Sequence, residues 1–393
     1  MSASREEPGA ALAAGAVLLL SFVDGGFFPS TWPPAIAFFL TAAALAAVLR
    51  RRLEVTRAQA LCIAAMAGLA AWTVLSVLWS SDPGSSWLEA QRTFVYVATI
   101  AATVTVAGSL LGGTLAGVAL VCAYSLRQRL LQGPPSPPDP FEGALLQEPL
   151  GYANALGGLA AIGLASAVVL LLRGRTRMVS AGLIALFLVT LALTGSRGGW
   201  IAALVGGTLT LALACDRTRI ARMVAVAAGM LLAVALVVSR GSLADDLAER
   251  GGDRPWYWHV AWQEVTDSPL VGRGAGTFEL SWLEHQPIDR AVVDAHSLYL
   301  ETLAELGLVG LGLLGLALAP PLVIALRHAH APAAAGGYIA FLFHTGIDWD
   351  WEMPAVTVTG LLCGGAILVA AHGAPRPDGL GCHPSERRNA PIS

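Results

Sequence analysis

Apolar stretches of about 15 to 22 residues recur along the chain, separated by short polar segments, and a bilayer crossing takes roughly 20 helical residues. The pattern predicts an all-α polytopic membrane protein of about twelve transmembrane helices, forming one domain over residues 1–393. Four of these spans are short and are expected to be tilted or re-entrant. The predicted spans are Ala10–Val23, Pro34–Leu49, Ala58–Trp79, Thr93–Leu111, Thr114–Leu126, Tyr152–Leu172, Met178–Thr194, Trp200–Ala214, Met223–Ser239, Leu298–Leu326, Ala333–Ile347 and Pro354–Ala371.

Composition excludes an ordinary soluble protein. Charged residues make up 13% of the chain and apolar residues 55%, with a mean hydropathy of +0.64. Soluble domains carry about 25% charged residues. The first span also has the length of a signal-peptide core, but no small-residue cleavage site follows it, so it is interpreted as a span. Five cysteines without a CxxC pair indicate neither disulfides nor a thiolate metal site.

Arginine supplies every basic side chain, and its distribution predicts the orientation. Cytoplasmic loops are enriched in basic residues. In a twelve-span topology, 15 Arg and 6 acids fall on one face and 9 Arg and 21 acids on the other. We therefore expect both termini in the cytoplasm, with a polar tail over 374–393. The clusters that decide this are Arg50, Arg51, Arg52 and Arg57; Arg173, Arg175 and Arg177; and Arg217, Arg219 and Arg222.

One loop, residues 240–297, is far longer than the other connections and is predicted to be extracytoplasmic. It holds ten acids, five Arg and four of the eleven Trp. Trp belts populate both membrane interfaces, whereas ten of the eleven Trp here fall on the outer side. That bias indicates a surface that stacks on a partner such as sugar rings. A second outer loop, 132–150, contains six Pro and is expected to be an extended cover.

Two arginines on the outer side are candidate anion sites. Arg197 lies in a glycine-rich turn, which exposes backbone N–H groups. Arg254 precedes Pro255 and follows Asp253, a plausible helix cap, so Arg254 is expected at a helix N-terminus that favours an anion. The alternatives are that Arg197 reaches a lipid phosphate and that Arg254 forms a surface ion pair. Trp258 shares a helix face with Trp262 and is expected to pack on the membrane side.

His296 is the candidate base. A histidine can take a proton from a hydroxyl near neutral pH, and Asp294 could orient it. The alternative is an interfacial or capping histidine. Glu301 and Glu305, four apart, could line a cavity or bind neighbouring helices. The segment from His344 to Glu352 could bind a divalent ion through its carboxylates, but alternating Asp, Trp and Glu at an interface needs no ion. The glycine-rich run 269–278 lacks a βαβ context and predicts a tight turn instead of a nucleotide loop.

These motifs, in this order, resemble the O-antigen ligase and polymerase family. The stronger matches lie between Thr194 and Gly310, and Ser297 stands where Asn is commoner after the histidine. The segments that carry the resemblance are Gly195–Trp200, Arg254 with Trp258, Pro269–Phe278 and His296–Gly307, with weaker matches at Trp79–Pro83 and Gly151–Ala155.

The resemblance implies a GT-C-like membrane glycosyltransferase of the bacterial cytoplasmic membrane. Such enzymes transfer a glycan from undecaprenyl diphosphate to an acceptor hydroxyl on a glycan, lipid or protein, with inversion and without metal, nucleotide or other cofactor. No nucleic-acid partner is implied. Arg197, Arg254 and His296 take the catalytic roles. The candidate substrate-binding residues are Arg273, Arg290, Asp294, Trp258, Asn154 and Tyr152.

Three other functions stay open. A polymerase of the same family would extend the glycan on its own lipid. Twelve spans with both ends inside would also suit a secondary transporter, although transporters concentrate ionisable groups at the bilayer midplane and often contain repeats, and no repeat is visible. A non-catalytic scaffold of polysaccharide assembly would not need the arginines and His296 to converge.

Overall fold

The structure, a computed structural model, describes residues 7–50, 53–106, 108–138, 143–174, 176–214, 253–328 and 331–372. Over these residues every regular element is a helix. The longer helices are α1 (Glu7–Ser21), α2 (Trp32–Leu49), α3 (Arg57–Ser76), α4 (Pro83–Thr105), α5 (Leu110–Gln132), α6 (Ala153–Leu172), α7 (Arg177–Thr194), α8 (Arg197–Ala214), α11 (Arg254–Asp267), α12 (Phe278–His285), α13 (Leu298–His328), α14 (Pro332–His344) and α15 (Pro354–His372). Short 3₁₀ turns are η2 (Asp24–Gly26), η3 (Pro29–Thr31) and η4 (Asp350–Glu352).

The helices follow the hydropathy pattern. Eleven predicted spans coincide with α1–α8 and α13–α15, and the ninth, Met223–Ser239, lies outside the described residues. Seven helical segments are long and apolar enough to cross a membrane: Pro29–Leu49, Arg57–Ser76, Leu110–Gln132, Ala153–Leu172, Arg177–Thr194, Leu298–Arg327 and Pro354–His372. The prediction of an all-α, multi-span membrane protein is confirmed. The count of twelve and the GT-C arrangement stay predictions.

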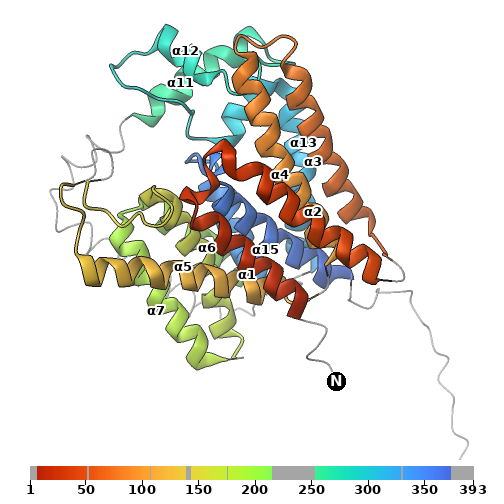
Figure 1. The fold of residues 1–393 in the computed structure, drawn as a ribbon, viewed down its shortest axis with the longest axis vertical. Coiled ribbons are helices and arrows are strands. Elements are labelled where there is room, and N and C mark those ends of the chain that lie inside the picture. Colours follow the sequence, from red (N-terminus) through yellow and green to blue (C-terminus); the bar gives the residue numbers. More distant parts are fainter. Residues whose placement is uncertain are drawn as a thin grey trace, which may run out of the picture.

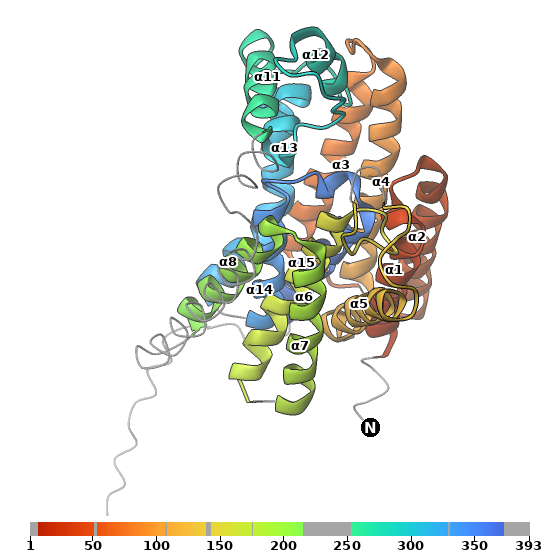
Figure 2. The same cartoon turned by 90° about the vertical axis from the view of Figure 1, so that its left-hand side faces the viewer.

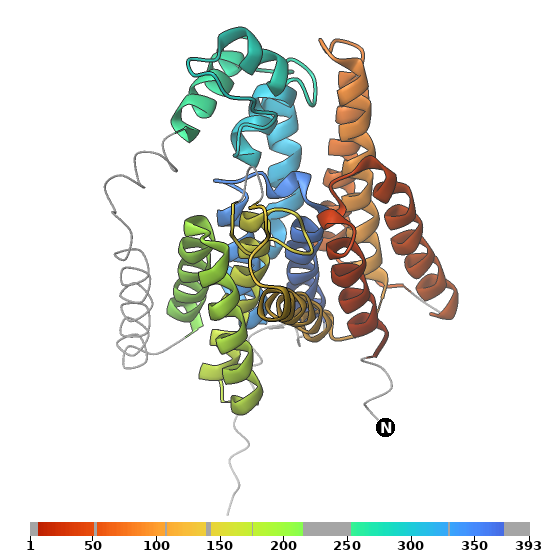
Figure 3. The same cartoon turned by 60° about the vertical axis from the view of Figure 1, so that its left-hand side comes forward.

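Two helices, α15 and α6, form the centre of the bundle. In Figure 3, α15 lies between α6–α8 on one side and α1 and α2 on the other. Small residues allow these apolar helices to approach closely, because a Cβ at Gly365 would lie 2.8 Å from Thr103 on α4 and one at Gly157 would lie 2.5 Å from Ser196. The contact at Gly157 matters for the site, because it fixes the turn before α8 against the first turns of α6.

The two ends of the bundle differ in their cover. The α11 and α12 helices lie over one end, against α13, while the C-terminal ends of α2 and α6 lie towards the opposite end (Figures 1 and 2). The assignment of the long loop and the Arg-rich connections to opposite membrane faces stays a prediction. α5 runs at a steep angle to α13 (Figures 1 and 2). The prediction that the fifth span is short was wrong, because α5 has 23 residues and is long enough to cross a membrane.

The glycine-rich run 269–278 is a structural turn, as predicted. Gly272, Gly274 and Gly276 have positive φ angles, and a Cβ at Gly272 would lie 2.2 Å from the backbone of Glu305. α13 is interrupted at Gly307, where the Leu308 N–H donates to the Pro269 carbonyl instead. The Glu305 carboxylate accepts hydrogen bonds from the N–H groups of Gly276 and Phe278. This turn therefore ties the loop to the top of α13.

The loop helices also have a hydrophobic core of their own. Trp282 is fully buried against Tyr257 and Phe278, and its Nε1–H donates to the Arg290 carbonyl at 2.6 Å. α11 begins at Arg254, as predicted, but the Asp253 side chain does not cap it. Asp253 accepts from Arg290 Nε at 2.8 Å instead, because a guanidinium competes better for a carboxylate than a backbone N–H.

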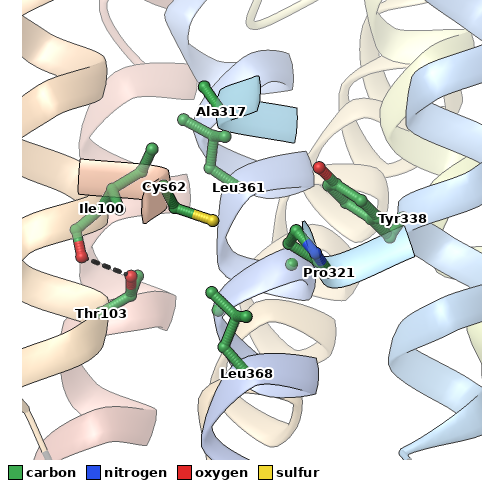
Figure 4. A pocket seen from close by; sticks show the side chains of 10 residues that line it. Cys62, Ile100, Thr103, Ala317, Pro321, Tyr338, Leu361 and Leu368 are labelled. Atoms are coloured by element: carbon green, nitrogen blue, oxygen red, sulfur yellow. Dashed lines mark hydrogen bonds between the residues drawn. The ribbon is translucent and has the colours of Figure 1, made fainter. Parts of the chain in front are cut away.

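A small cavity of about 10 Å³ lies among the spanning helices, bordered by α3, α4, α13, α14 and α15 (Figure 4). Its walls are mostly apolar, and the Thr103 hydroxyl already donates to the Ile100 carbonyl at 2.8 Å. No charged side chain lines it among the described residues. A charged substrate group would have no partner there.

Candidate active site

His296 is held in an unusual backbone conformation at the end of the long loop. Its φ of 54° lies in the left-handed region, which costs a non-glycine residue about 1–3 kcal/mol and persists only where the surroundings impose it. The Ala295 N–H donates to Glu301 Oε2 at 2.7 Å, which fixes the preceding peptide to α13. The His296 ring lies near Tyr257 and Trp349, with ring centroids 5.2 and 6.3 Å apart. Loop and helix together therefore set where this imidazole points.

The hydrogen bonding of His296 defines its tautomer. Nδ1 lies 2.9 Å from the Asp294 carbonyl oxygen, which can only accept, so Nδ1 carries the proton. In the neutral ring Nε2 is then an acceptor. Desolvation lowers the pKa of His296, against the opposing effect of the Asp348 carboxylate. A neutral imidazole with a free Nε2 is what a general base requires.

Arg254 does not stand alone at the start of α11. Its Nη2 donates to Asp348 Oδ2 at 2.9 Å, and Asp348 is buried at 2% side-chain exposure. Asp348 Oδ1 accepts from the Tyr152 hydroxyl at 2.8 Å, and Asn154 Nδ2 donates to that hydroxyl at 2.9 Å. Tyr152 and Trp349 pack ring to ring, 4.6 Å between centroids. One chain of hydrogen bonds thus joins the start of α6, the segment before η4 and the start of α11.

Arg197 is the first residue of α8, next to a tight turn. Gly195 adopts the left-handed conformation that ends α7, and Ser196 Oγ accepts from the Gly199 N–H at 3.1 Å. The Arg197 guanidinium is half-buried and has no hydrogen bond or ion pair within the described part of the chain. A fixed cation without a partner, at a helix N-terminus, is suited to an anion.

The structure does not bring Arg273 and Arg290 to this place. Arg273 Nη1 donates to Ser281 Oγ at 2.8 Å, and its guanidinium lies 3.8 Å from Glu264 and 3.6 Å from Glu284. Arg290 is exposed and pairs with Asp253. Trp258 packs at the edge of the loop core, while Trp262 is exposed. The charges of the two arginines are therefore used within the loop.

Asp294 faces a group of acids. Oxygens of Asp294, Glu301 and Glu352 lie within 4.8 Å of one another. Desolvation, opposed by Arg92, raises the pKa of Asp294 to about 7. These carboxylates could in principle hold a divalent cation, but Glu352 is already bound to Arg92 at 2.6 Å and Glu301 to a backbone N–H. We assign no metal ligands here.

The segment from Thr345 to Met353 contributes residues for which the sequence suggested only a possible divalent ion and no protein partner. Asp348 binds Arg254 on α11, Asp350 Oδ2 binds His344 Nδ1 on α14 at 2.5 Å, and Glu352 binds Arg92 on α4. Each of three alternating acids thus meets an Arg or His side chain from a different helix. The only sequence signal was the alternation itself, which predicts one exposed face but names no partner.

The structure is that of a multi-span membrane protein in which Arg254 binds Asp348 and the His296 ring lies against the neighbouring Trp349. Residues 182–315 match the model of the O-antigen ligase family (Wzy_C). The match contains Arg197, Arg254 and His296 and confirms the resemblance found in the sequence. It links the protein to membrane-bound synthesis of cell-surface polysaccharide. No curated protein matches the chain.

Proposed function

We propose that this protein transfers an undecaprenyl-diphosphate-linked glycan to an acceptor hydroxyl at the outer face of the bacterial cytoplasmic membrane. Both termini then lie in the cytoplasm. The observation that carries the proposal is the tautomer of His296, whose Nε2 is free to accept a proton, at the end of the bundle that also holds Arg254. The family match supports the class of reaction.

In the proposed reaction, the acceptor oxygen attacks the anomeric carbon and its proton passes to His296 Nε2. The bond between that carbon and the diphosphate oxygen breaks, and the electron pair leaves with undecaprenyl diphosphate. Arg197 and Arg254 hold the negative charge that develops on this leaving group. Attack from the opposite face inverts the anomeric carbon. No step requires a metal ion or a cofactor.

A ligase and a polymerase would use the same chemistry and differ in the acceptor. Incubation of the protein in vesicles with lipid-linked donor and either an acceptor glycolipid or a second donor molecule separates them. Product on the glycolipid identifies a ligase, and a lengthened lipid-linked glycan identifies a polymerase. If both substrates stay chemically unchanged and either one is transported across the vesicle membrane, the result would favour the transporter.

The arginines provide the test of donor binding. Lysine keeps the charge but loses the planar fork that binds two phosphate oxygens. Arg197→Lys and Arg254→Lys should each raise the KM for the lipid-linked donor, whereas Arg127→Lys, on an exposed part of α5, should not. Unchanged donor KM in both variants would contradict the proposal and favour lipid-phosphate contacts for Arg197.

A further inference from the structure

A histidine–aspartate pair lies buried behind the site and has no part in the proposed chemistry. His344, the last residue of α14, is 1% exposed, and Asp350 is fully buried. Their second polar atoms, His344 Nε2 and Asp350 Oδ1, have no hydrogen-bond partner among the described residues. Buried polar atoms without hydrogen bonds cost stability, whereas apolar side chains at these positions would leave no polar atom unpaired. Packing alone therefore does not explain the pair.

The pair lies between the elements that carry the two arginines. A Cβ at Gly198, the residue after Arg197, would lie 3.2 Å from His344 Nε2. A Cβ at Gly158, one helical turn after Asn154, would lie 3.1 Å from His344 Nδ1. The imidazole therefore packs directly against the backbone of α8 and α6, where both glycines make room for it.

On its other side the pair fixes the acidic segment. Asp350 is two residues from Asp348, the anchor of Arg254, and the Thr357 hydroxyl binds the Asp350 carbonyl at 2.8 Å. The Nδ1–Oδ2 hydrogen bond thus joins the first turn of α8, through the imidazole, to the segment that holds Arg254. A Cβ at Gly198 would also lie 3.2 Å from Ile347, which precedes Asp348, so the first turn of α8 contacts this segment at two residues.

We propose that His344 is a positioning residue, which with Asp350 sets the spacing of Arg197 and Arg254 so that both reach one diphosphate. The inference rests on the proposed function and adds a residue to it. His344 does not touch the donor; it acts through Gly198 and Asp348. Its loss should therefore weaken donor binding before it affects the chemical step.

Three substitutions separate this role from simple packing. His344→Phe keeps the ring and removes the hydrogen bond to Asp350. His344→Asn replaces Nδ1–H by an amide N–H at a similar distance from the backbone, so it keeps that bond. Gly198→Ala leaves the pair intact but pushes the imidazole away from α8. Gly207→Ala, farther along α8 with open space around its Cβ, is the matched control.

We expect His344→Phe to raise the KM for lipid-linked donor by about 10- to 100-fold, since displacements of about 1 Å cost this much in positioned sites. Gly198→Ala should raise the donor KM less. His344→Asn should bring the donor KM most of the way back to the wild-type value, and Gly207→Ala should have the wild-type donor KM. The kcat at saturating donor should change little. A merely structural role would instead lower the active fraction, and hence kcat, at constant KM.

Wild-type donor KM in both His344→Phe and Gly198→Ala would overturn the inference. If His344→Phe does not fold, the comparison of donor KM between Gly198→Ala and Gly207→Ala decides whether the inference holds. The arginine variants distinguish this failure from failure of the proposed function. If Arg197→Lys and Arg254→Lys weaken donor binding while the Gly198 and His344 variants do not, the function stands and the positioning role falls.

Discussion

The long loop and the short segment 345–353 use their charges in opposite ways. In the loop, Arg273 and Arg290 bind Ser281, acids of α11 and α12, and Asp253, all within the loop itself. In the short segment, Asp348, Asp350 and Glu352 each bind an Arg or His side chain on another helix. The loop is thus largely self-supporting, whereas the segment connects α4, α11 and α14.

This difference teaches that the number of charges in a loop is a weak guide to function. The long loop is rich in Arg, acids and Trp. Among its described residues, it places only Arg254 and the Asp294–His296 end near the site. What matters is whether a charge is neutralised inside its own segment. Three predictions test the contrast, from the largest effect to the smallest.

The largest effect is expected where the short segment meets the loop. Asp348→Asn keeps the shape but removes the carboxylate that holds Arg254, and its amide N–H₂ must face a donor, either Arg254 or the Trp349 N–H. Donor KM should rise by about 10- to 100-fold because Arg254 is no longer positioned. Asp289→Asn, an exposed acid of the loop, is the control and should match the wild type. Equal donor KM for the two variants would contradict the role of Asp348 in positioning Arg254.

A second effect concerns the pH dependence of transfer. A base must be deprotonated, so the rate falls as the pH drops through the pKa of His296, about tenfold per pH unit. Burial lowers that pKa below the ordinary value of about 6.5, with Asp348 and Arg254 as the charged groups facing the ring. The midpoint of the acid limb should therefore lie below pH 6.5.

Asp294 is the neighbouring group that also titrates near neutrality, since its pKa is about 7. The profile is therefore best measured in the Asp294→Asn variant, where that carboxyl cannot contribute. An acid limb with its midpoint at pH 7 or above in this variant would contradict a buried, neutral His296 as the base.

The smallest effect on activity is expected inside the loop. Arg273→Ala leaves Glu264 buried without its cation, which should destabilise the loop by about 1–3 kcal/mol and lower the melting temperature in detergent. Donor KM should not change. Arg290→Ala, whose pair is exposed, should lose at most about 1 kcal/mol. A raised donor KM at unchanged stability would restore Arg273 as a substrate-binding residue.

Much of the fold could be predicted because lipid imposes a simple rule on sequence. A run of apolar residues of bilayer length must be helical, and the described helices follow those runs. Local backbone rules were also sufficient for the turn at 269–278 and for the start of α11 at Arg254, just before Pro255. The Asp253 cap was wrong because a partner 37 residues away, Arg290, competes for that carboxylate.

The partners of the site could not be predicted for the same reason. Arg254 and Asp348 are 94 residues apart and Arg92 and Glu352 are 260 apart. Which acid meets which cation depends on how the helices pack, and hydropathy does not specify that. The sequence did give the types of residue at the site, Arg and His, because the chemistry of a diphosphate leaving group limits the choice.

The most direct test of the central claim is transfer by a His296→Gln variant that is shown to bind the donor. Glutamine keeps a hydrogen bond but cannot take the acceptor proton, so the single-turnover rate should fall by about 10² to 10⁴ while donor binding stays normal. His259→Gln, an exposed histidine on α11, should transfer at the wild-type rate. Near-normal transfer by donor-bound His296→Gln would show that His296 is not the base.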